Sequence, residues 1–467
     1  MFEKIKKAVT AFMRKAGAET QLGKEFKDIF EVSGIPAFNQ FYYFGIFIWK
    51  WIYRGFYNAW HLIPAPTIKD PGRKRELFRL NVAKALCSEL AGMVWTDGAE
   101  ITVSQKGYKP EDSEDRNATD PLNDYIQEVL SEAGFQHNII TFVEKAAALG
   151  GAALKVWYDE RRDSDGNVIP GTGKVKLGYC MADQFVPTAW DNANVTEGVF
   201  ISRIAKDGWY YTRLEWHKWN GETYVISNEL YRAPMKQAAN NETQDILGFR
   251  YPLQTIYPFL DDNTPINGLE KSLFSYFRTP TANNLDDNSP LGVSIYANAM
   301  DTLRALDICF DSFVREFQLG KKRIIVPAQA IKTVCDPETG EFRRYFDPND
   351  EVYQALSIDD REQLKIQDNS VELRIEEHVG AINAFLNILC LQVGLSAGTF
   401  SFDTKSGLKT ATEVVSENSK TYKTVKCYQE QIKPAIYRLI NNILAVSALY
   451  DVEWQGHKIS DLIAGGY

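Results

Sequence analysis

The sequence predicts an α+β protein, and three observations support that prediction. Aromatic residues make up 13% of the 467 residues, which suits extended sheet and buried interfaces. Between residues 197 and 231, runs rich in Val, Ile, Tyr and Trp alternate with the turn signals Asp207-Gly208 and Asn220-Gly221, which is typical of a β-meander. In the C-terminal third, apolar residues recur at helical spacing over long stretches. The length favours about three domains.

Charge and cysteine content limit the function classes. The chain carries 52 basic and 61 acidic residues, a formal net charge of −9. This balance argues against a protein that clamps DNA through bulk positive charge, although it allows loose contact. The six cysteines lie far apart without a CxxC pair, so neither a zinc ribbon nor a dense disulfide framework is indicated. A reducing compartment fits best.

The N-terminal end is basic, with 14 Lys and Arg against 7 Asp and Glu in residues 1–80. It lacks the unbroken apolar stretch of a secretory signal. Apolar residues recur there at helical spacing, with lysines between them: Phe2, Ile5, Val9, Phe12 and Ala16. This pattern predicts a peripheral amphipathic helix, and a helix that docks on a partner or a membrane surface is the alternative.

Residues 32–49 contain no charge and are the one candidate for a membrane span. Only residues 41–49 are densely apolar, far short of the roughly 20 residues that a spanning helix needs. We therefore expect no membrane span. Twelve aromatic residues lie between Phe38 and Trp60, and we expect packing or a subunit interface to bury them.

Local signals place the next elements. Residues 75–95 are predicted to be helical because apolar residues, Phe78 among them, form one stripe. Asp120-Pro121 predicts a helix start and Gly134 its end. A second helix is expected to end at Gly150-Gly151.

Strands are expected next, over residues 153–158 and 174–179, with a turn at Asp165-Gly166 between them. The meander described above follows, and residues 233–291 are rich in turn-forming residues with few long periodic runs.

After Gly292 the pattern is helical. Residues 293–319 carry an apolar stripe, with Asp301, Asp307 and Asp311 on the other face, and predict a helix of roughly 40 Å. Residues 321–368 indicate a small β-rich insert, with one strand at 324–326, a turn at 337–340 and a return strand at 341–346.

A further helix is predicted over residues 371–394, followed by a loop over 395–409 that is rich in Gly, Ser and Thr. Residues 410–413 form a capping box that opens a helix to about residue 448. Pro434 lies inside this helix, so a kink is expected there.

No catalytic pattern is complete. Residues 166–171 have the glycine spacing of a phosphate loop, but Thr172 stands where the loop needs lysine. Residues 163–166 faintly resemble a calcium loop, but Arg161 fails as a ligand and a hairpin turn is favoured. Neither HExxH nor GxSxG occurs. We therefore expect no enzyme, no metal and no cofactor.

Charged groups outside these motifs are interpreted as structural. Four adjacent carboxylate pairs begin at Asp261, Asp286, Asp359 and Glu376, and neighbouring side chains diverge, which favours solvated faces. The five histidines are scattered without ligand spacing. The basic triplet Lys321, Lys322 and Arg323 could meet phosphate or complement the dipole of the preceding helix, and the second interpretation is favoured.

Three stretches, taken in order, point to a family. The first is Asn81-Val-Ala-Lys-Ala-Leu-Cys-Ser-Glu-Leu-Ala91. The second is Gly292-Val-Ser-Ile-Tyr-Ala-Asn-Ala299, later followed by Leu319-Gly-Lys-Lys-Arg-Ile324. The third runs from Thr410-Ala-Thr-Glu-Val414 to Leu439-Ile440. Together they resemble portal proteins of long-tailed double-stranded DNA bacteriophages, over most of residues 45–447.

The resemblance implies a portal fold with an α/β wing, long stem helices, a small β-rich clip and a kinked C-terminal helix with a reduced crown. Carried onto this chain, it implies seven segments: 1–291 as N-terminal region and wing, 292–320 as stem helix, 321–368 as clip, 369–394 as second stem helix, 395–409 as channel loop, 410–448 as wing and crown helix, and 449–467 as C-terminal tail or reduced crown.

The resemblance also implies function and partners. Portals form a homo-oligomeric ring, usually of twelve subunits, at one capsid vertex of the virion, which assembles in the host cytoplasm. Double-stranded DNA passes through the channel without sequence specificity during packaging and ejection. The implied partners are the terminase, a head-completion or tail adaptor protein and the major capsid protein. Two alternatives remain open: another viral structural or minor capsid protein, and an enzyme with a dispersed site.

Site residues follow from the same resemblance. The loop is the part that approaches DNA, and its candidates are Ser396, Thr399, Phe400, Ser401, Phe402, Lys405 and Lys409. Docking candidates between stem and clip are Lys321, Lys322 and Arg323, and Pro434 is the expected helix kink.

Overall fold

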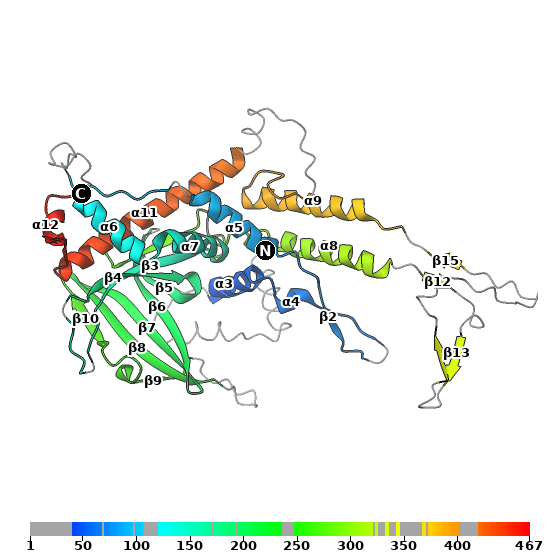
Figure 1. Ribbon diagram of the computed structural model, residues 1–467, viewed down its shortest axis with the longest axis horizontal. Coiled ribbons are helices and arrows are strands. Elements are labelled where there is room, and N and C mark those ends of the chain that lie inside the picture. Colours follow the sequence, from blue (N-terminus) through cyan, green and yellow to red (C-terminus); the bar gives the residue numbers. More distant parts are fainter. Residues whose placement is uncertain are drawn as a thin grey trace, which may run out of the picture.

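The computed structural model combines helices and antiparallel sheets (Figure 1). It describes residues 40–67, 70–96, 99–106, 120–163, 165–169, 171–192, 194–235, 247–320, 323–325, 332–335, 342–345, 367–369, 372–401 and 419–467. The predicted N-terminal amphipathic helix and the capping box at 410–413 lie outside these residues. No helix among the described residues is long and apolar enough to cross a membrane.

The aromatic segment forms α3 (Gln40–Tyr53) and the short α4 (Asn58–His61). Tyr42, Tyr43 and Trp49 are almost completely buried within the chain itself. Tyr43 donates a hydrogen bond to the backbone oxygen of Phe185, and Tyr42 donates one to that of Gly292. Packing within the subunit therefore accounts for this segment, so it needs no subunit interface to cover it.

The helix expected over residues 75–95 is shorter than predicted. Residues Lys74–Glu76 form β2, which pairs with β1 (Leu62–Pro64), and the helix α5 runs only over Val82–Val94. The backbone N–H groups of Phe78 and Leu80 donate to carboxylates of another helix, so they cannot belong to a helical ladder. Phe78 is exposed. Only the part of the predicted apolar stripe from residue 82 onward lies on a helix.

Both predicted helix boundaries further along are confirmed. α6 spans Pro121–Glu132, and the Asp120 side chain accepts a hydrogen bond from Leu122 N–H as its cap. α7 spans Phe135–Leu149 and ends at Gly150, which has a φ of 92°. A Cβ at Gly150 would lie 2.4 Å from the Gly292 oxygen, so the close approach also requires glycine.

Two antiparallel sheets carry the body. One has the order β11-β3-β4, built from β3 (Gly151–Asp159), β4 (Lys174–Met181) and β11 (Phe274–Arg278). The predicted turn at Asp165-Gly166 lies between β3 and β4, and the Asp163 carboxylate accepts backbone N–H groups there, as a turn requires. Helices α5, α6 and α7 lie together beside this sheet (Figure 1).

The predicted meander forms the second sheet, with the order β10-β8-β7-β6-β5 and with β9 also paired to β8. Its strands are β5 (Phe185–Asp191), β6 (Asn194–Lys206), β7 (Trp209–Asn220), β8 (Thr223–Pro234), β9 (Phe249–Tyr251) and β10 (Asn263–Ile266). The 3₁₀ turns η2 (Ala182–Gln184) and η3 (Leu253–Thr255) flank it. Asp207 and Gly208 both have positive φ, which matches the predicted hairpin turn.

The long helix expected from residue 293 begins later, as α8 (Met300–Leu319). The segment before it pairs with other parts of the chain: Ile295 N–H donates to the Ala147 oxygen, and the Thr279 hydroxyl donates to that of Val293. These bonds occupy backbone groups that a helix would need. The predicted end at Gly320 is confirmed.

Beyond α8, the described part of the insert consists of short strands. β12 (Arg323–Ile325) pairs with β15 (Gln367–Asn369), and β13 (Lys332–Cys335) pairs with β14 (Phe342–Tyr345). The return strand was predicted correctly as β14, but its partner β13 was not. The predicted turn at 337–340 lies outside the described residues.

The C-terminal part closes the core. α9 spans Ile375–Val393 and α11 spans Ser419–Leu449, with Pro434 inside α11. The hairpin of β16 (Glu453–Trp454) and β17 (His457–Lys458) follows, and then α12 (Ile459–Ile463). The inner face of α11 contributes Tyr428, Leu439 and Ile443 to the same core that buries α3, α5 and α7.

Candidate functional site: the α8–α9 hairpin and the segment after it

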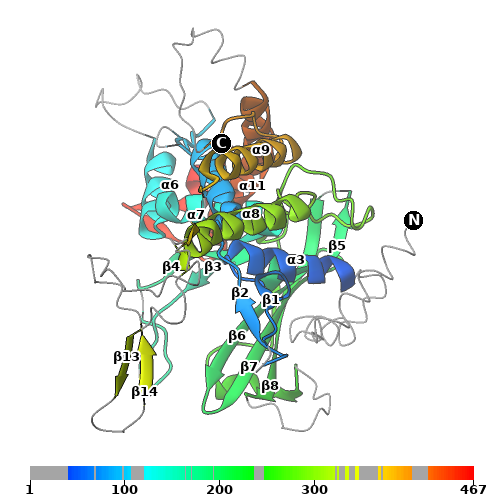
Figure 2. The same cartoon turned by 90° about the vertical axis from the view of Figure 1, so that its right-hand side faces the viewer.

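Helices α8 and α9 lie side by side and project from the body towards β12 and β15 (Figures 1 and 2). They are antiparallel, because Arg374, just before α9, meets Glu316 near the end of α8. Arg374 donates from Nε to Oε1 over 3.1 Å and from Nη2 to Oε2 over 2.9 Å. The hydrogen bond from Arg374 lowers the pKa of Glu316 to about 2, so this carboxylate stays charged at neutral pH.

The middle of α8 is hydrogen-bonded to the segment of residues 57–80. Asp311 is buried and accepts two hydrogen bonds from Arg75, of 2.7 and 2.6 Å, and a third from Phe78 N–H. One turn earlier, Asp307 accepts from Leu80 N–H and lies 3.0 Å from His61 Nε2. Two carboxylates four residues apart therefore fix the orientation of α8 on the body.

Sequence reasoning missed this role for Asp307 and Asp311, which it placed only on the helix face opposite the apolar stripe. Their partners lie more than 200 residues away, so no local pattern reveals the contacts. The available signal was the spacing of four between two acids, which places both on one face of the helix.

α9 is apolar on both sides. Its inner stripe is buried and comprises Ile382, Leu386, Leu389, Cys390 and Val393. Its outer stripe still exposes Ile388 by 43% and Leu391 by 69%. Residues 379–393 contain no charged side chain at all. The outer side also carries the polar residues Asn387 and Gln392, but an exposed apolar stripe of this kind is a surface that a partner would cover.

The start of the predicted channel loop is anchored rather than free. Ser396 N–H donates to Thr421 Oγ1, and Thr421 N–H donates to Ser396 Oγ. Thr424 donates to the Gly394 oxygen, and Gly398 N–H donates to Asn387. The bonds made by Thr421 and Thr424 join the end of α9 to the start of α11, so the two ends of the intervening segment lie together.

The predicted loop residues separate into three groups. Ser396 is buried and uses its hydroxyl within the chain, and Phe400 is half-buried against the core, so both serve as anchors in this structure. The Thr399 hydroxyl donates to the Ser396 oxygen, whereas Ser401 is exposed. Three candidates lie outside the described residues: Phe402, Lys405 and Lys409.

The remaining predicted site residues are only partly placed. Lys321 and Lys322 lie outside the described residues, and Arg323 begins β12. Pro434 lies within α11, which continues on both sides of it. The kink at Pro434 remains a prediction.

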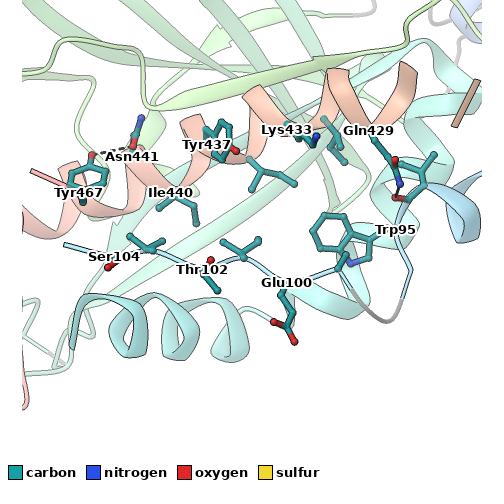
Figure 3. Close-up of a pocket in the computed structure, with 16 residues that line it drawn as sticks. Trp95, Glu100, Thr102, Ser104, Gln429, Lys433, Tyr437, Ile440, Asn441 and Tyr467 are labelled. Atoms are coloured by element: carbon teal, nitrogen blue, oxygen red, sulfur yellow. Dashed lines mark hydrogen bonds between the residues drawn. The ribbon is translucent and has the colours of Figure 1, made fainter. Parts of the chain in front are cut away.

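A groove of about 690 Å³ lies between α11 and the extended segment of residues 99–104 (Figure 3). Its apolar lining comes from Val94, Ile432, Ile436 and Ile440, among others. Tyr437 stands at its edge and is 68% exposed.

No group of acidic, histidine or cysteine side chains that could hold a metal ion occurs among the described residues. His61 and His217 are both buried and hydrogen-bonded, as expected for core histidines. The site therefore consists of packing surfaces and anchored chain ends, without the geometry of a reaction centre in this part of the chain.

The described residues therefore present exposed apolar surfaces and hydrogen-bonded chain ends. A family model described as "Phage portal protein, SPP1 Gp6-like" matches residues 46–459, nearly the whole chain. The chain belongs to this portal family, which is structural and has no enzymatic class, and the resemblance noted in the sequence is confirmed. A search of curated proteins finds no match to this chain.

Proposed function

We propose that this chain is the subunit of a closed ring at one capsid vertex, with a channel through which duplex DNA is packaged and later ejected. The observation that carries this proposal is α9. Its uncharged stretch exposes Ile388 and Leu391 to solvent in a single subunit, and a neighbouring subunit would bury them.

A closed ring needs two different surfaces on each subunit, because every contact is head to tail. The outer stripe of α9 supplies one surface. The groove beside α11, with Tyr437 at its edge, is a candidate for the second. Neither surface copies the other, which suits a ring better than a two-fold dimer.

The segment assignments are part of the proposal. We assign residues 1–291 to the N-terminal region and wing, 292–320 and 369–394 to the stem, 321–368 to the clip, 395–409 to the channel loop, and 410–448 to the wing and crown helix. We assign residues 449–467 to a C-terminal tail or reduced crown. Within them α12 contacts α6 and α11, and Trp454 of the small hairpin donates to Glu128 of α6.

The partners follow from the same proposal. Terminase docks first and drives DNA through the channel, then a head-completion or tail adaptor protein takes its place, and the major capsid protein surrounds the ring. An acidic chain suits a conduit, because each tight phosphate contact would hold moving DNA. ATP turnover is then the work of the terminase, and the ring itself, usually of twelve subunits in this family, needs no cofactor.

Imaging the purified full chain tests this proposal. Negative-stain images should show rings with a central hole of duplex width, and native mass spectrometry should give one closed subunit number. Only monomers or dimers at concentrations well above micromolar would contradict the ring. ATP hydrolysis by the rigorously purified ring alone would contradict the structural role.

A further inference from the structure

The groove between α11 and residues 99–104 presents apolar surface that no other described residue covers (Figure 3). Buried isoleucines of α11 form its floor. Accessible apolar surface remains on both walls, because Ile101 and Val103 are half-buried and Tyr437 is exposed. Polar side chains line the same groove: Glu100, Thr102, Ser104, Lys433 and Asn441. An apolar centre within a polar rim is the usual composition of a protein docking site.

The N-terminal sequence carries an apolar stripe whose length matches the groove. Residues 1–39 lie outside the described part of the chain. Their stripe follows spacings of three and four: Phe2, Ile5, Val9 and Phe12. These spacings place the stripe on one face of a helix. From Phe2 to Phe12 such a helix measures about 15 Å, and the α11 residues that line the groove, 429–441, span about 18 Å.

The charges of the segment and the groove also match. Residues 1–16 carry five basic side chains and one acidic side chain. At the rim of the groove, Glu100 is exposed and forms no ion pair with another described residue. The basic side chain that lines the groove, Lys433, already pairs with Glu430 over 2.9 Å. The free carboxylate at the rim therefore favours a basic partner.

The segment and the groove belong to opposite sides of one subunit. The N-terminal segment joins the body at α3, whereas residues 99–104 are hydrogen-bonded to Asn123 and Gln127 of α6. α3 and α6 lie on opposite sides of α7 (Figure 2). A head-to-tail contact joins one side of a subunit to the opposite side of the next one. Residues 17–39 span up to about 80 Å when extended, which is ample to cross one such contact.

We propose that residues 2–16 of one subunit dock as an amphipathic helix in the α11 groove of the neighbouring subunit. The apolar stripe packs against Ile101, Val103 and Tyr437, and the basic side chains beside it face Glu100. This inference rests on the proposed ring, and it names the segment that fills the groove. A helix laid in an apolar groove is a recurring way for one chain to hold another.

Photochemical cross-linking of the assembled full chain tests this contact. Phe12 is replaced by benzoylphenylalanine, and the peptides linked after irradiation are identified by mass spectrometry. The links should reach residues 94–104 or 429–441 of a second chain, and the product should migrate at twice the subunit mass on a denaturing gel. Adding Val9→Asp should lower the yield of this link about tenfold or more, because the new charge would be buried in an apolar groove.

Lys7→Gln is the matched control, because Lys7 lies on the helix face opposite the stripe and its loss should leave the yield nearly unchanged. Native mass spectrometry of the same samples reports the ring separately. Intact rings in which the probe links to another surface, or to the groove of its own chain, would overturn this inference and leave the ring standing. An unchanged yield in Val9→Asp would overturn it as well. Absence of rings would overturn both proposals.

Discussion

Ser396 and Thr421 each donate a backbone N–H to the other's side-chain hydroxyl, over 2.9 and 3.2 Å. Both residues are buried. The pair closes the base of the segment between α9 and α11, and it also satisfies one of the free N–H groups in the first turn of α11. The ends of the proposed channel loop are therefore fixed, whatever the residues between them do.

We expect Ser396→Ala and Thr421→Val to loosen this base. Each variant should lower the free energy of unfolding by about 1 kcal/mol, the usual contribution of such a hydrogen bond. The double variant should cost less than the sum, because the two bonds share both residues. Limited proteolysis between residues 402 and 418 should become faster.

Ser312→Ala is the matched control for this pair, because the Ser312 hydroxyl bonds only its own helix on an exposed face. It should leave both stability and cleavage near wild-type values. Additive losses in the double variant would show that the two bonds act separately.

Asp311 should contribute more to stability than the Ser396–Thr421 pair, because it joins α8 to the body of the subunit. Asp311→Asn removes the charge that holds Arg75, and we expect a loss of about 2 kcal/mol or more in the free energy of unfolding. Chemical denaturation of the full chain measures this. Asp301→Asn, on an exposed position of the same helix, should change stability little, and equal losses in the two variants would refute the tie.

Leu391→Asp tests the outer stripe of α9. Because Leu391 is 69% exposed in one subunit, the substitution should leave the fold of the subunit intact. It should prevent or weaken ring formation, since a charge would be buried at the contact. Native mass spectrometry reports the subunit number. Phe259→Asp is the control, because Phe259 is a comparably exposed apolar residue near the meander, and the same loss in both variants would argue against a specific interface.

Elements with local signals could be predicted from the sequence. Asp120 caps α6, Gly150 ends α7, and Asp207-Gly208 turns the meander, because each signal acts within a few residues. The family and its α+β class were also correctly predicted. Such features need no knowledge of distant contacts.

The wrong helix predictions arose where contacts between distant residues decide the structure. Residues 75–81 and 293–299 carry helical apolar spacing, but distant partners occupy their backbone groups. The candidate site shows the same effect of distant contacts. Residues 395–401 follow α9, and Ser396 proved to be an anchor because Thr421, in α11, bonds it. Tertiary hydrogen bonds override local preference in each case.

A buried ionic cluster between β3 and the meander strand β7 should make the fold sensitive to acid. Glu215 accepts from Lys155 Nζ at 2.8 Å to both oxygens and from His217 Nε2 at 2.9 Å. Burial alone would raise the pKa of Glu215, but the His217 hydrogen bond and the charges of Lys155 and Arg213 hold it well below its ordinary value. Burial lowers the pKa of His217.

Protonation of either Glu215 or His217 should lower the stability of the fold. The unfolded chain protonates its histidine near pH 6.5 and its glutamate near pH 4.3, whereas the folded chain resists both steps. Stability should therefore be complete at neutral pH, fall as the pH drops below about 6.5, and fall further below about 4.5. The slope is up to about 1.4 kcal/mol per pH unit for each proton. Urea denaturation of wild type and His217→Gln checks it, and an unchanged slope between pH 7 and 5 in that variant would exclude His217 as the cause.

The last prediction concerns the part of the loop beyond Ser401. Phe400 packs against the core, so replacing it would confound stability with function. The sharper variant keeps Phe400 and replaces Phe402, Lys405 and Lys409 with serine. Two lysines are too few for tight DNA binding, since strong non-specific binders neutralise about six to ten phosphates, but they suffice for brief contact. We expect rings to form normally, while particles package less DNA or lose it sooner. Lys458→Ser, at an exposed site on β17, is the control for loss of charge. DNA content per particle, measured before and after storage, decides the matter: normal content and normal retention in the triple variant would remove this loop from any role in gripping DNA.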